Sequence, residues 1–107
     1  MDFDMRKWDI GRTADVAWTP WGGGDLARAK VLASGDGFHL ALVEAQPGYV
    51  GDPHEHRFTE FLYVIAGTLQ SNGEELTVGD GYVASAGSAH QQFSTDTGAT
   101  YVSIFKL

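Results

Sequence analysis

The sequence predicts an all-β domain, built either as a sandwich or as a closed antiparallel barrel. Three observations support this prediction. Glycine accounts for 14 of the 107 residues and falls between short apolar runs, as tight turns between strands require. No segment keeps the 3.6-residue period of an amphipathic helix. The dipeptide Asn72-Gly73 is typical of a two-residue type I′ hairpin. A closed barrel would leave no strand edge to protect.

The expected strands follow one another along the chain. Residues 25–33 (DLARAKVLA) are ambiguous, because Ala, Leu and Arg favour a helix but the stretch is short. Residues 38–45 (FHLALVEA) alternate as a half-buried strand does. The remaining strands are expected at 61–65, 69–71, 76–78, 82–84, 91–94 and 100–107, with turns at 35–37, 72–73, 80–81 and 96–98.

Composition excludes several classes of protein. With 14 acidic and 7 basic residues the net charge is -7, which disfavours the phosphate neutralisation that nucleic-acid binding needs. The absence of cysteine excludes disulfides, thiolate zinc sites and cysteine nucleophiles. No apolar run approaches the roughly 20 residues of a membrane helix, and the first residues, MDFDMRKWDIG, lack the apolar core of a secretory signal. We therefore expect one cytoplasmic domain that binds neither nucleic acid nor membrane.

The stretch 48–67 (GYVGDPHEHRFTEFLYVIAG) carries the candidate metal ligands. His54 and His56 are two residues apart, so on a strand they point to the same face, and Glu60 has the same parity. Imidazoles and a carboxylate suit one divalent transition metal, and Fe, Mn, Ni, Zn and Cu are not distinguished by these ligand types. The alternative interpretation is a pair of exposed histidines at a strand start with a surface glutamate.

The spacing of this stretch resembles the first motif of the cupin superfamily in full. The motif is read as Gly48, five residues, His54, one residue, His56, three residues, Glu60, six residues and Gly67. A second stretch, 79–94 (GDGYVASAGSAHQQFS), resembles the second cupin motif and supplies His90. It departs from the family pattern with Ser85 in place of Pro and Ser94 in place of Asn.

The resemblance implies a single cupin domain over residues 1–107, of the small bacterial type. Its fold would be an antiparallel β-barrel or double-stranded β-helix of the jelly-roll kind, with the FLYVIAG run filling the barrel. His54, His56, Glu60 and His90 would converge on one metal ion inside the open end. Small cupins are commonly homodimers. The segment around Trp18 and Trp21 also resembles the lead-in of ChrR-like cupins, a group that includes metal-dependent dioxygenases and the sensory domain of zinc-bound anti-sigma factors.

Three neutral imidazoles and one carboxylate would leave two positions open on a six-coordinate ion. Such an ion can act as a Lewis acid on a carbonyl or enolate, or lower the pKa of bound water. Glu60 either ligates the ion or serves as the catalytic general base. A redox-active ion would also permit oxygen chemistry.

Three further residues are candidates for substrate binding. Gln92 shares the parity of His90 and would hydrogen-bond a ligand, or else it is a solvated strand residue. Arg57 lies between two ligands and would sit at the rim of the site or in solvent. Tyr49 flanks the ligands, as does Asp52, which alternatively only sets a turn. His39 has no partner at a ligand spacing and is interpreted as structural.

Two classes of function therefore compete, with a purely structural metal site as a third. The first is a metal-dependent enzyme of the dioxygenase or isomerase/lyase type, acting on a small oxygenated organic molecule inside the barrel. The second is a module that binds a small ligand or senses a metal without turnover. Binding-only cupins are often fused to a DNA-binding or signalling domain, and 107 residues leave no room for one, which favours the enzyme.

Overall fold

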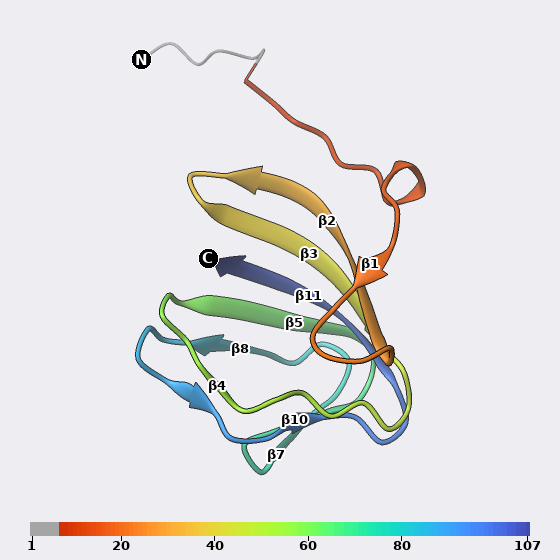
Figure 1. Ribbon diagram of the computed structural model, residues 1–107, viewed down its shortest axis with the longest axis vertical. Helices are drawn as coiled ribbons and strands as arrows, with labels where there is room; N and C mark the ends of the chain where they lie inside the picture. The colour runs from red at the N-terminus through yellow and green to blue at the C-terminus, as the bar shows by residue number, and fades with distance from the viewer. Residues whose placement is uncertain (1–6) are drawn as a thin grey trace.

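The computed structural model describes residues 7–107, and its antiparallel strands confirm the all-β prediction (Figure 1). Residues 1–6, at the start of the stretch in which we sought a secretory signal, lie outside the described part. The strands are β1 (Thr19–Pro20), β2 (Ala27–Gly35), β3 (Phe38–Ala45), β4 (His54–Glu55), β5 (Glu60–Gly67), β6 (Leu69–Ser71), β7 (Glu74–Leu76), β8 (Gly81–Ala84), β9 (Ala89–His90), β10 (Phe93–Ser94) and β11 (Ala99–Lys106). A 3-10 turn, η1 (Thr13–Asp15), precedes them.

The strands form one large sheet and two small ones. The large sheet has the order β1-β2-β3-β11-β5-β8, so the last strand of the chain lies at its centre, between β3 and β5. The small sheets are β10-β6-β7 and the pair β4-β9. In Figure 1 the large sheet fans across the upper part of the molecule, and β4, β7 and β10 lie below it. This is the jelly-roll arrangement that we expected. No helix within residues 7–107 has the length and apolar character needed to cross a membrane.

The ambiguous segment 25–33 is a strand for most of its length. Ala27 and Ala29 are buried and alternate with Arg28, whose side chain is exposed and pairs with Glu44 of β3 at 2.9 Å. β2 pairs with β3 along most of its length, and with β1 at Arg28 and Ala29. These tertiary contacts outweigh the weak helix preference of alanine.

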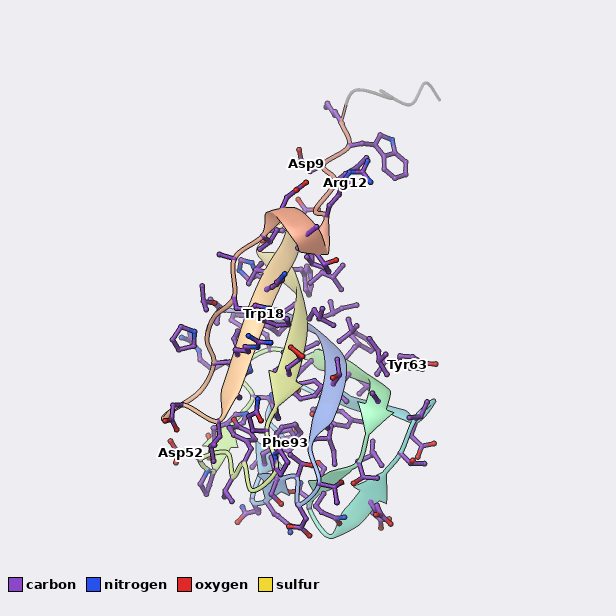
Figure 2. All side chains as sticks on the ribbon, turned by 90° about the vertical axis from the view of Figure 1, so that its right-hand side faces the viewer. Asp9, Arg12, Trp18, Asp52, Tyr63 and Phe93 are labelled. Atoms are coloured by element: carbon purple, nitrogen blue, oxygen red, sulfur yellow. The ribbon has the colours of Figure 1, made fainter. Side chains whose placement is uncertain are left out.

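Strand β5 has two different faces, which corrects the expectation that the FLYVIAG run fills the barrel. Leu62 and Val64 point inward and are 4% and 0% exposed. Phe61, Tyr63 and Ile65 point outward and are 51%, 54% and 44% exposed. Alternation along a strand allows only every second residue to reach the interior. Figure 2 shows the ring of Tyr63 directed away from the sheet.

The interior is closed by aromatic rings and by small side chains. The ring of Phe93 on β10 meets those of Tyr49 and Tyr101 edge-on, at centroid distances of 6.5 and 5.7 Å. Figure 2 places Phe93 in the lower part of the molecule. The buried apolar residues are Ala27, Ala29, Ala41, Val43, Ala45, Tyr49, Leu62, Val64, Leu69, Leu76, Phe93, Ala99 and Tyr101.

The hairpin predicted at Asn72-Gly73 joins β6 to β7. Both residues have positive φ, 48° and 85°, as the two centres of a type I′ turn require. Asparagine is one of the few residues besides glycine that adopts this conformation readily. The turn brings the side chain of Asn72 against the segment that carries His90.

Candidate metal centre

Three of the four predicted ligands meet at the mouth of the barrel. His54 on β4 pairs in register with His90 on β9, and His56 follows β4 by one residue. One ligand nitrogen from each ring lies within 4.8 Å of the other two. His56 Nε2 and His90 Nδ1 are 3.1 Å apart. Two nitrogens bound to one ion at about 2.1 Å would lie roughly 3.0 to 3.4 Å apart, so this donor set fits a single transition metal.

Metal ligation requires a neutral imidazole with its lone pair aimed at the ion, and the structure supplies a feature of this kind at His54 and at His90. His54 Nδ1 donates to the backbone carbonyl of Asp52 at 3.0 Å, which leaves Nε2 free to face the other rings. His90 is buried, and this burial, with His56 and His54 beside it, lowers its pKa to about 4. At neutral pH His90 therefore offers a lone pair and not a second proton.

Asn72 holds the backbone on both sides of His90. Its Nδ2 donates to the carbonyl of Ala89 at 3.0 Å. Its Oδ1 accepts from the backbone N–H groups of Gln91 and Gln92 at 2.8 and 3.1 Å. The hairpin between β6 and β7 thus fixes the short segment that presents His90 to the other two rings.

Glu60 lies outside the group of three nitrogens but faces the same interior. It is half-buried at the start of β5. Its Oε1 accepts from the hydroxyl of Tyr82 at 2.9 Å, and its Oε2 accepts from Ser103 Oγ at 3.3 Å. Burial, followed by the nearby Glu60, raises the pKa of Tyr82, so the phenol keeps its proton and donates. The two roles predicted for Glu60, metal ligand and general base, stay predictions.

Two cavities border the three histidines. The inner cavity has a volume of about 340 Å³, and its walls include Trp21, Tyr49, Glu60, Tyr82, His90 and Tyr101. The outer cavity has a volume of about 460 Å³, and its walls include Trp21, Arg57, Phe58, Glu60, Phe105 and Lys106. His54, Trp21 and Glu60 line both, so the two cavities adjoin at the candidate metal centre. A larger hollow of about 780 Å³ between β7 and β8 touches only His90 of the three histidines.

The residues predicted to bind substrate occupy different places. Tyr49 lines the inner cavity, and burial, followed by the charge of Asp52, raises its pKa. Arg57 lines the outer cavity. Gln92 lines neither cavity, because its Oε1 accepts from the backbone N–H of Gly73 at 2.8 Å and supports the hairpin instead. His39 also lies apart, with its Nδ1 hydrogen-bonded to Ser34 at 2.7 Å.

Several residues of the cavity walls were not predicted. Tyr82 and Ser103 both pair in register with Leu62, two positions from Glu60 on the inner face of β5. The alternation of β8 and β11 could have identified them, but only once these strands were known to flank β5. Trp21 lies on the loop before β2, and strand alternation carries no signal there.

Comparison with protein families assigns the chain to a known group of domains. The family model described as the ChrR cupin-like domain matches residues 7–106. A search of curated proteins gave no match.

Solved structures share the fold at low sequence identity. KdgF from Halomonas sp. is 21% identical over 94% of each chain, with a TM-score of 0.79. An acetylacetone dioxygenase from Acinetobacter johnsonii is 14% identical over 99% of this chain and 80% of that one, with a TM-score of 0.76. A chain of the Rhodobacter sphaeroides complex of SigE with the anti-sigma ChrR is 23% identical over 89% of this chain and 52% of that one, with a TM-score of 0.75.

Proposed function

The chain belongs to the family of ChrR cupin-like domains, and from this premise we propose that it is a metal-dependent enzyme. Its substrate is a small oxygenated organic molecule, and its reaction is a dioxygenation, or an isomerisation or lyase reaction through an enolate. The observation that carries this proposal is the group formed by His54, His56 and His90 at the junction of two cavities. These three histidines hold one divalent transition metal.

A bound divalent ion supplies a Lewis acid for a carbonyl or enolate oxygen, and a redox-active ion also supplies oxygen chemistry. The protein's own contribution centres on Glu60. Its carboxylate borders both cavities and is held by the hydroxyls of Tyr82 and Ser103. We assign Glu60 the role of proton acceptor, because a fixed carboxylate beside the substrate cavity can take a proton from a carbon next to a carbonyl.

The alternative role for Glu60 is that of a fourth metal ligand, as the family motif implies. The substitution Glu60→Gln distinguishes the two. If Glu60 is the proton acceptor, the variant binds metal as tightly as the wild type but loses turnover. If Glu60 is a metal ligand, the variant loses turnover and its dissociation constant for the metal also rises.

The inner cavity suits a small substrate. Its volume of about 340 Å³ lies at the lower end of the range of ligand pockets. Its walls include the apolar side chains of Trp21 and Phe93 and the phenols of Tyr49 and Tyr101. We propose that Tyr49 contacts the substrate here.

The proposal is tested by metal analysis of untagged protein purified without oxygen. We expect about one transition metal per chain in the wild type and its loss in His54→Ala and His90→Ala. The matched control is His39→Ala, since His39 lies on β3 outside both cavities. Sub-stoichiometric metal in the wild type, with no further change in the two ligand variants, would contradict the metal site.

Turnover is then measured on the metal-loaded protein. Oxygen uptake and product analysis with diketones, catechols and hydroxy-ketones test the two reaction types. Consumption of substrate that depends on His90 and Glu60 supports the enzyme.

The second candidate is a binding module that senses a metal or a small ligand. The family assignment favours it, as does the structural similarity to the SigE–ChrR complex. This function predicts tight metal binding with no product formed from any substrate class in the panel. A ligand-dependent change in the affinity of the metal-loaded protein for a purified sigma factor would support it.

We also propose that the protein forms a homodimer through the outer face of the large sheet. This face carries exposed apolar side chains of β5, β8 and β11, namely Phe61, Tyr63, Ile65, Val83 and Ile104. Apolar surface gathered in this way is typical of an interface. Light scattering after gel filtration should give twice the chain mass for the wild type and the chain mass for Tyr63→Lys. A monomeric wild type would contradict the proposal.

A further inference from the structure

The outer cavity lies beside the nitrogens that would hold the metal. His54 and His56 both contribute to its walls, and its volume is about 460 Å³. It also shares Trp21 and Glu60 with the inner cavity. A molecule bound in the outer cavity can therefore reach the candidate metal centre with one end.

Aromatic rings supply the apolar walls of the outer cavity. Trp21 and Phe105 meet edge-on at a centroid distance of 5.4 Å and are both half-buried. Phe58 is 36% exposed and completes the set. Rings arranged in this way offer flat apolar surfaces against which a planar ligand packs.

Two basic side chains converge on one of these rings. The guanidinium carbon of Arg57 lies 5.6 Å from the ring centroid of Phe58, and Lys106 Nζ lies 5.4 Å from the same centroid. Lys106 Nζ also lies 5.3 Å from the ring of Phe38. Arg57 comes from the loop after β4 and Lys106 from the end of β11. Such cation–π contacts hold two positive charges at the edge of the cavity.

Neither of these two charges forms an ion pair with a carboxylate of residues 7–107. Within residues 7–107 the one ion pair joins Arg28 to Glu44, away from the cavity. The acidic residues that line the outer cavity are Glu55 and Glu60. Both oxygens of Glu60 already accept hydrogen bonds. Two of the chain's seven basic residues thus converge on this cavity, although the chain as a whole has a net charge of -7.

We propose that the outer cavity binds a small organic carboxylate. The apolar body packs against Trp21, Phe58 and Phe105, and the carboxylate meets Arg57 and Lys106. The oxygenated opposite end reaches the three histidines. This inference rests on the proposed function and narrows its substrate class to oxygenated carboxylic acids with a flat or apolar body.

The test compares two probes that differ only in their remote charge. In 4-carboxybenzohydroxamate and 4-carbamoylbenzohydroxamate, the hydroxamate chelates a metal at one end of the ring, and the other end carries a carboxylate or a neutral amide. Calorimetric titration of zinc-loaded protein gives both dissociation constants. We expect the carboxylate to bind about fivefold to tenfold more tightly, which corresponds to about 1 to 1.4 kcal/mol. A single exposed charge pair contributes about 0.2 to 1 kcal/mol, and here the carboxylate meets two positive charges.

The double variant Arg57→Gln/Lys106→Gln tests the assigned residues. It should bring the ratio of the two dissociation constants close to one and leave the affinity for the amide probe unchanged. The matched control is Arg28→Gln/Lys30→Gln, which also removes one arginine and one lysine. These two side chains lie over the ring of Trp18, outside the outer cavity. This control should keep the wild-type ratio.

Each remaining outcome contradicts the proposal. These outcomes are a ratio near one in the wild type, an unchanged ratio in Arg57→Gln/Lys106→Gln, and failure of the zinc-loaded protein to bind either probe. Elemental analysis of the same samples separates two kinds of failure. If the wild type holds zinc at one per chain without preferring the carboxylate, only the carboxylate inference is wrong. If the wild type holds no zinc, the proposed function is wrong and the inference fails with it.

Discussion

The hydrogen bond between Tyr82 and Glu60 can be tested by removing one hydroxyl. Tyr82→Phe keeps the ring, which lies 5.6 Å from that of His90, and deletes only the donor to Glu60 Oε1. A hydrogen bond to a charged acceptor contributes about 1.5 to 3 kcal/mol. Glu60 is only half-buried and keeps the longer contact with Ser103, so water can replace part of the loss. We therefore expect a destabilisation of about 1 to 2 kcal/mol.

The assay is thermal unfolding of the metal-free protein, because a bound ion would add its own stabilisation. For a domain of this size the change corresponds to a melting temperature about 5 to 10 °C below wild type. Tyr63→Phe is the matched control, since the Tyr63 side chain is 54% exposed on the outer face. A double-mutant cycle with Glu60→Ala should give a coupling of about 1 kcal/mol. If Tyr82→Phe melts within about 1 °C of Tyr63→Phe, or if the coupling is zero, the reasoning is refuted.

Three further predictions concern His90, Asn72 and the core. The metal-free protein should lose stability as pH falls from about 6.5 toward 4, because His90, with a folded pKa of about 4, stays neutral while the unfolded chain takes up a proton. The midpoint of urea unfolding should depend less on pH in His90→Gln than in the wild type. An equal dependence on pH in the two proteins would contradict the argument. Asn72→Gly keeps the positive φ but removes the amide contacts around His90, so the zinc affinity measured by competition titration should fall about tenfold. The control Asp36→Gly, at another residue with a positive φ of 54°, should leave the zinc affinity unchanged. Val64→Ala should cost about 2 to 3 kcal/mol in denaturant unfolding, because Val64 is fully buried, whereas its outward neighbour Ile65→Ala should cost clearly less.

The fold could be predicted wherever the local pattern and the packing agree. The alternation of residues 38–45 predicted β3, and the pair Asn72-Gly73 predicted the hairpin. The sequence left residues 25–33 ambiguous, because the buried alanines of β2 have no strand preference of their own. There the structure depends on pairing with β3, which no short window of sequence contains.

The candidate site could likewise be predicted only in part. His54, His56 and His90 were predicted because the spacing of the residues around them matches the two cupin motifs, and the three rings do meet in space. The partners of Glu60 could not be found from spacing. Tyr82 and Ser103 reach its carboxylate from β8 and β11, and only the order of strands in the large sheet makes them neighbours.

One wall of the inner cavity is bare backbone, at Gly22 and Gly23. Gly22 has a φ of 69°, and a methyl group built on it would lie 2.9 Å from the hydroxyl oxygen of Tyr49. A methyl group on Gly23 would lie 3.4 Å from a carboxylate oxygen of Asp52. The inner cavity therefore extends up to the backbone here, because neither glycine has a side chain to fill it. Even the smallest side chain at Gly22 would displace the Tyr49 phenol. Substitution of either glycine can therefore reduce the volume of the inner cavity but cannot increase it.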